Sequence, residues 1–87
     1  MNYRRPANVA EHREEDALYV AVVPDGPIQI LDPVAAIIWE EALDGAPTGL
    51  VERVAARTSA EPEEIRPHVD AFIADLVERG LLDEVEG

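Results

Sequence analysis

Hydrophobic and polar residues alternate along two short segments in the first half of the chain. Large aliphatic residues occupy every second position from Leu18 to Val22, and the segment from Ile28 to Leu31 repeats the alternation. A period of two residues is typical of strands with one buried face. Between these segments, Pro24-Asp25-Gly26 favours a turn, because proline fixes φ and glycine tolerates positive φ. We therefore expect a hairpin, and we predict a third strand over about residues 7–13.

From residue 33 onward, the apolar residues recur at the spacing of a helix. Asp32 is a suitable N-cap and Pro33 fits the first turn, so a first helix is predicted from there to Gly45. Thr48 is expected to cap a second helix that ends near Thr58. The apolar stripes of these two helices consist of Val34, Ile37, Ile38 and Leu43, and of Leu50, Val51, Val54 and Ala55.

A third helix is predicted to open at Ser59 or Glu61 and to end at Gly80. Pro67 lies in its interior, and we expect it to kink the helix or to delay its start, because proline removes a backbone hydrogen bond. The residues after the helix, Leu81 and Leu82, are expected to fold back onto the core. The buried stripe is expected to consist of Ile65, Val69, Phe72 and Leu76, which step by four, three and four residues.

This order of elements predicts one α+β domain over residues 1–87. Strands within about residues 7–31 form a three-stranded antiparallel sheet, and helices within about residues 33–80 form a three-helix bundle. A small sheet cannot cover its own apolar face, whereas three helices packed on that face can. The arrangement resembles a winged helix-turn-helix.

The charge of the chain excludes several classes of protein. Its 87 residues include 19 Asp and Glu against seven Arg and no Lys, which gives a formal charge of −12. Nucleic acids and anionic membranes bind through cations, so neither is expected as a partner. A DNA-binding winged helix is the alternative, and it would need a basic face that the predicted helices lack. With no apolar segment that suits a membrane span or a signal peptide, we expect a cytoplasmic protein.

No combination of residues points to catalysis or to a cofactor. The chain has no Cys, so it offers no thiolate nucleophile, thiolate metal site or disulfide. His68 and Asp70 lie about 200° apart around a helix and do not converge on one metal ion. The acidic runs are typical of solvated turns and helix starts. We therefore predict a protein that is not an enzyme and has no metal or cofactor, in which Trp39 is a core residue or the wall of a peptide groove.

Two features favour peptide recognition. The strand 28–31 follows Pro27, which cannot donate to a ladder, so this strand is expected at a sheet edge that could accept an extended peptide. On the third helix, a mixed face consists of Arg66, Asp70, Ile73 and Val77, again at steps of four, three and four. This face could line a groove. Alternatively, its apolar pair widens the core and its charged pair forms an exposed ion pair. Spacing leaves both readings open.

Three segments together resemble a known family. They are Ile30-Leu31-Asp32-Pro33 leading to Ile38-Trp39, the junction Leu43-Asp44-Gly45-Ala46-Pro47-Thr48, and Val69-x-x-Phe72-Ile73 leading to Gly80-Leu81-Leu82. In order and spacing they resemble the PqqD-like family, also called RiPP recognition elements, over about residues 7–83. The chain departs from the family pattern at Ala17, where glycine is common, and at Gln29, where a bulkier residue is frequent.

The resemblance implies a non-catalytic protein that binds the leader peptide of a ribosomally made precursor. The leader would add as a strand between the third strand and the third helix. Carried over by position, the pairing edge consists of Ile28, Gln29, Ile30 and Leu31. The helix side consists of Arg66, Val69, Asp70, Ile73, Ala74 and Val77.

The resemblance also suggests partners. The chain looks most like the stand-alone leader-binding proteins of lasso peptide clusters, whose partner is a leader-cleaving cysteine protease (B2-type). The alternative is a peptide chaperone that presents a precursor to a radical-SAM enzyme in PQQ or similar biosynthesis. A third possibility is a module that recognises only its enzyme partner. We expect a monomer, although a free sheet edge could pair with a second copy.

Overall fold

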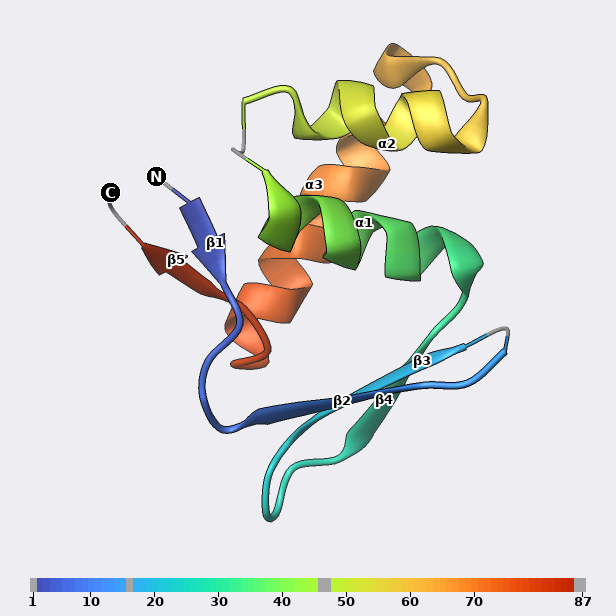
Figure 1. The fold of residues 1–87 in the computed structure, drawn as a ribbon. Coiled ribbons are helices and arrows are strands. Elements are labelled where there is room, and N and C mark those ends of the chain that lie inside the picture. Colours follow the sequence, from blue (N-terminus) through green and yellow to red (C-terminus); the bar gives the residue numbers. More distant parts are fainter. Residues whose placement is uncertain (1, 16, 46–47, 86–87) are drawn as a thin grey trace.

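The computed structural model describes residues 2–15, 17–45 and 48–85 (Figure 1). Asp16 of the acidic segment and Ala46-Pro47 of the predicted helix junction lie outside these residues. The chain forms β1 (Asn2–Arg4), β2 (Val9–Arg13), β3 (Leu18–Val22), β4 (Ile28–Leu31), α1 (Pro33–Asp44), α2 (Leu50–Thr58), α3 (Pro62–Glu78) and β5 (Asp83–Val85).

The strands β2, β3 and β4 form an antiparallel sheet in that order, as predicted. Leu18 and Val20 point into the core and are fully buried, while Tyr19 and Ala21 lie on the opposite face. The register pairs Tyr19 with Ile30 and with His12 of β2. All three helices lie on one side of this sheet (Figure 1). The α+β class is confirmed, and the likeness to a winged helix-turn-helix stays an interpretation.

The helix starts are set by different residues. The predicted cap of α1 is confirmed, because the Ala35 N–H donates to Asp32 Oδ1 at 2.8 Å. The predicted cap of α2 is wrong. Gly49, not Thr48, precedes that helix, with φ of 85° and no side-chain capping bond. Only glycine adopts this left-handed backbone without strain, so the chain turns into α2 one residue later than predicted.

Arg53 of α2 ties the two helices together. Its Nε donates to Glu41 Oε1 at 2.9 Å, and its Nη2 donates to the Glu41 carbonyl at 3.1 Å. Its Nη1 donates to the Thr48 carbonyl at 3.2 Å. The guanidinium lies so close to Gly45 that a Cβ there would be 2.8 Å from Nη2. Burial of Glu41 opposes ionisation, but the hydrogen bonds from Arg53 and Arg57 outweigh it and lower the pKa of Glu41.

Helix α3 begins at Pro62 and runs through Pro67, so the delayed start that we considered is wrong. Its buried residues are Val69, Ile73 and Leu76, whereas Ile65 and Phe72 are only partly buried. The face of the helix that packs on the core is therefore rotated from the predicted stripe toward Ile73. The expected return of Leu81 and Leu82 onto the core is confirmed, since both are buried.

A second, two-stranded sheet was not predicted. β1 pairs antiparallel with β5, with Tyr3 opposite Glu84 and Arg4 opposite Asp83. The Arg4 Nη2 donates to Asp83 Oδ2 at 3.3 Å across this pair. Strands of three residues are too short to show a hydrophobic period, and their partners lie at opposite ends of the sequence. Figure 1 shows them side by side, next to α1 and α3.

The core lies between the inner face of the three-stranded sheet and the helices. Trp39 of α1 is only 1% exposed, which confirms that it is a core residue. Around it pack the buried residues of every larger element, including Leu18, Val54 and Leu76. Within the described ranges, no helix is long and apolar enough to cross a membrane.

We predict that Arg53→Ala lowers the free energy of unfolding by about 1–2 kcal/mol, because it leaves the partly buried Glu41 without its main donors. The control is Arg79→Ala, which removes an exposed pair to Asp75 within one helix. This change should cost less than about 0.5 kcal/mol. Equilibrium urea denaturation measures both. Equal losses in the two variants would show that Arg53 does not hold the junction.

Candidate functional site

The two edges of the three-stranded sheet differ in charge. The edge strand β2 carries Glu11, His12 and Arg13 in succession, and these pair with Arg5, Glu14 and Glu40. The other edge strand, β4, reads Ile-Gln-Ile-Leu and has no charged residue. Charged side chains protect an edge from pairing with another chain. The edge without charged side chains is therefore β4, the strand predicted to accept a peptide.

The predicted edge residues divide between two faces. Ile28 and Ile30 lie on the outer face and are 66% and 65% exposed. Leu31 points inward and is buried, and Gln29 is partly buried. A peptide strand paired with β4 would form hydrogen bonds with the backbone of alternate residues of this strand. It would reach the side chains of only the outer pair and of Gln29.

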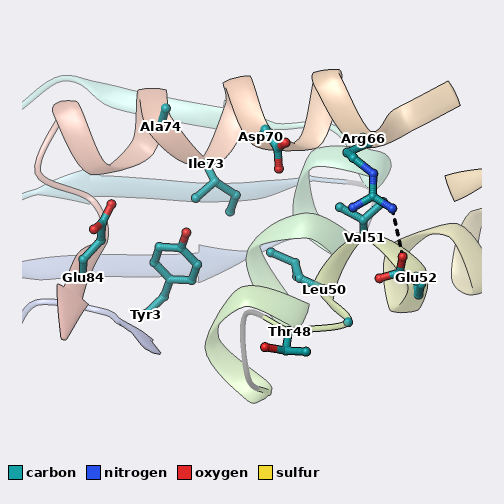
Figure 2. A pocket seen from close by; sticks show the side chains of 11 residues that line it. Tyr3, Thr48, Leu50, Val51, Glu52, Arg66, Asp70, Ile73, Ala74 and Glu84 are labelled. Carbon is teal, nitrogen blue, oxygen red and sulfur yellow. Dashed lines mark hydrogen bonds and ion pairs between the residues drawn. The ribbon is translucent and has the colours of Figure 1, made fainter. Parts of the chain in front are cut away.

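The predicted helix residues are largely brought together. Arg66, Asp70, Ile73 and Ala74 line a cavity of about 320 Å³ over α3. Figure 2 shows these side chains facing Tyr3 and Glu84 on one side and the start of α2 on the other. The other two predicted residues do not line it. Val69 is buried in the core, and Val77 is partly buried against the core.

Arg66 does not pair with Asp70, and the predicted ion pair is therefore wrong. Its Nη2 donates to Glu52 Oε2 of α2 at 3.0 Å and to Glu63 Oε1 at 3.1 Å. Helix α2 packs beside α3 and brings Glu52 across, as Figure 2 shows. The hydrogen bonds to Glu52 and Glu63 raise the pKa of Arg66. The cation thus closes one end of the cavity as a link between two helices.

The opposite end of the cavity is acidic and aromatic. The Tyr3 hydroxyl points toward α3 (Figure 2). Burial raises the pKa of Tyr3, and the nearby carboxylates of Glu84 and Asp70 raise it further. Neither carboxylate has an ion-pair partner among residues 2–15, 17–45 and 48–85. With Ile73 and Ala74 beneath, this end can accept hydrogen bonds or a cation above an apolar floor.

The structure places the two parts of the predicted site on separate surfaces. The cavity over α3 is lined by residues of β1, β5 and α2, and by none of β4. Sequence reasoning missed Tyr3 and Glu84, because it did not predict the pairing of β1 with β5, and it missed Glu52, because it did not predict that α2 packs beside α3. A lone aromatic residue in the polar N-terminal segment, Tyr3, is the one hint that the sequence offers. Contact of either surface with a peptide stays a prediction.

We predict that Tyr3 ionises at higher pH than an ordinary tyrosine, whose pKa is 10.0. Folding holds the pKa of Tyr3 above its value in the unfolded chain. The contribution of Tyr3 to the free energy of unfolding is therefore fully present below pH 10.0 and is lost as the pH rises through the higher pKa of the folded state. Ultraviolet titration of a Tyr19→Phe variant isolates Tyr3.

Asp70→Asn should then lower the pKa of Tyr3 by removing one of the two carboxylates. The matched control is Asp75→Asn, because Asp75 pairs with Arg79 outside the cavity. An unchanged Tyr3 titration in Asp70→Asn would contradict the proximity of the two groups.

The chain is similar to a known protein family. The model of coenzyme PQQ synthesis protein D (PqqD) matches residues 19–82. No curated protein and no solved structure matches the chain significantly. PqqD family proteins are non-catalytic accessory proteins that bind precursor peptides and act with modifying enzymes. Because the match spans well over half of the 87 residues, the chain belongs to the PqqD family and has its general role in recognising peptides.

Proposed function

We propose that this protein binds the leader peptide of a ribosomally made precursor as an added strand at β4, and presents the precursor to a modifying enzyme. The observation that carries this proposal is the contrast between the charged edge of β2 and the uncharged edge of β4. An unguarded edge strand supplies a row of backbone donors and acceptors to an extended peptide.

Strand addition predicts which side chains of the leader contact the protein. Successive side chains of the added strand would point to opposite faces of the sheet. Those on the outer face would lie beside Ile28 and Ile30, which are largely exposed. Those on the inner face would lie beside the partly buried Gln29. We therefore expect the leader to carry apolar residues at alternate positions.

In this proposal a further segment of the leader enters the cavity over α3, which is separate from the edge of β4 and is lined by four of the six predicted helix residues, Arg66, Asp70, Ile73 and Ala74. Of these, Asp70 and Ala74 are exposed within the cavity, so they are the ones that a peptide can contact directly. The more buried Val69, Ile73 and Val77 support this face from below. A leader segment with a basic side chain would satisfy the carboxylates of Asp70 and Glu84.

For the partner enzyme, we propose a leader-cleaving cysteine protease of a lasso peptide cluster, acting in the cytoplasm where the precursor is made. The chain itself has no Cys, so thiol chemistry would come from that partner. The family description, coenzyme PQQ synthesis, favours a second candidate, presentation of a precursor to a radical-SAM enzyme. The genes beside this one distinguish them, since a protease and a cyclase accompany the first candidate.

We predict saturable binding of the neighbouring precursor's leader, measured by fluorescence polarisation. Methylation of single backbone amides of the peptide tests the mode of binding, because it removes one donor at a time. Only alternate amides of an added strand face β4, so methylation at those positions should weaken binding about tenfold, about 1.4 kcal/mol. Uniform sensitivity along the leader would exclude strand addition. No saturable binding of the unmodified leader would exclude the proposed function.

We also predict that Ile30→Asp and Ala74→Arg each weaken leader binding about tenfold, about 1.4 kcal/mol. The first change puts a charge on the apolar edge, and the second fills the cavity over α3. Ala71→Arg is the matched control, because Ala71 is exposed on α3 and does not line the cavity. Circular dichroism must show that each variant is folded. Wild-type affinity in Ala74→Arg would show that the leader does not reach the cavity.

A further inference from the structure

The outer face of the three-stranded sheet carries an apolar surface that no described part of the chain covers. We call it the outer patch, and it consists of Ala10, Tyr19, Ala21, Val23, Ile28 and Ile30. The described residues include four exposed large hydrophobic side chains, and three of them, Val23, Ile28 and Ile30, belong to this patch. Such concentration on one face is typical of a protein-binding surface.

The register makes the outer patch continuous across all three strands. Ala10, Ala21 and Ile28 lie opposite one another in one row. Tyr19 lies between His12 and Ile30 in the next row. The small side chains of Ala10 and Ala21 leave a cavity of about 340 Å³ that Val23 and Ile28 also line, with Glu11 and His12 at its β2 side. A partner can therefore insert apolar side chains at the centre of the sheet.

Acidic residues border the outer patch, chiefly at one end. Glu14 and Glu15 line a neighbouring hollow together with Tyr19 and Ile28. At the opposite end, Asp25 lies in the turn between Pro24 and Gly26, which line the cavity. His12 bonds to Glu14 at 2.8 Å, whereas Glu15 and Asp25 have no ion pair within the described parts of the chain. An apolar centre with a polar rim is the usual anatomy of a protein interface.

The charges and dimensions argue against several occupants. A leader strand at β4 would lie one strand spacing, about 4.8 Å, from that strand, so it could not cover the column of Ala10 on β2. A second copy would bring the same acidic rim against itself, and each copy has a charge of −12. Anionic membranes and nucleic acids are repelled by the same rim. The outer patch requires a partner that is apolar at its centre and positively charged around it, and a protein with basic residues around an apolar patch meets both conditions.

We propose that the outer patch docks the modifying enzyme through an apolar surface ringed by Arg or Lys side chains. The identity of this partner rests on the proposed function. A leader paired with β4 would have its outward side chains level with Ile28 and Ile30, because an added strand continues the face of the sheet. The enzyme on the outer patch would then contact the leader at the border of the patch, so that enzyme and leader bind side by side on one face of the sheet.

The experiment measures binding of the purified modifying enzyme encoded beside this gene to the full chain, with and without leader. Ala10→Arg and Ala21→Arg each place a bulky cation in the patch, the first on the far edge strand β2 and the second on the central strand β3, opposite Ile28. We expect each variant to bind the enzyme at least tenfold more weakly, and Ala10→Arg to bind the leader within twofold of wild type. Ala10→Glu should bind the enzyme better than Ala10→Arg does, because it matches a basic rim. Ala71→Arg is again the control.

Several results would overturn the proposal. One is a lack of enzyme binding by the wild-type chain, or enzyme affinity within twofold of wild type in both Arg variants. Loss of leader binding in folded Ala10→Arg would assign the face to the peptide instead. A wild-type dimer that Ala10→Arg dissociates in sedimentation would assign it to a second copy. If wild type binds the enzyme and no leader, the proposed function fails while the docking surface stands.

Discussion

The sheet of this protein buries only one of its two faces, and the rest of the structure depends on that constraint. Leu18, Val20 and Leu31 present apolar side chains on the inner face. Three helices are required to keep water from them, and Trp39 fills the centre of the resulting core. Because β4 passes directly into α1 through Asp32, the last strand of the sheet has no following strand to pair with. One edge and one face are therefore left to interact with other molecules.

Charge separates these free surfaces from the remainder of the exterior. Six of the seven Arg residues pair with acids of other elements or loops, including Arg53 with Glu41 and Arg66 with Glu52. Strand β4 and the six residues that define the outer patch include no charged side chain. Uncharged backbone and apolar side chains thus remain accessible within an acidic molecule. Such a surface suits selective contact with peptides and proteins and disfavours nucleic acids.

The larger elements could be predicted from the sequence because their own residues specify them. The alternation from Leu18 and the cap Asp32 are local patterns, and the structure agrees with both. Some predictions failed on local detail, such as the start of α2 after Gly49, but those at the cavity failed because they depend on residues distant in the sequence. Arg66 pairs with Glu52 because α2 packs beside α3, and the spacing of residues within α3 does not reveal this packing. Likewise, the wall that Tyr3 provides exists only because the chain's first and last strands pair.

That pairing determines which part of the protein shapes the cavity over α3. The stretch that identifies the family, residues 19–82, contains β3 except its first residue, all of β4 and the three helices. Tyr3 and Glu84 lie outside it. One wall of the cavity is therefore independent of the sequence on which family membership rests. Changes in β1 or β5 can alter what the cavity accepts while the shared scaffold stays the same.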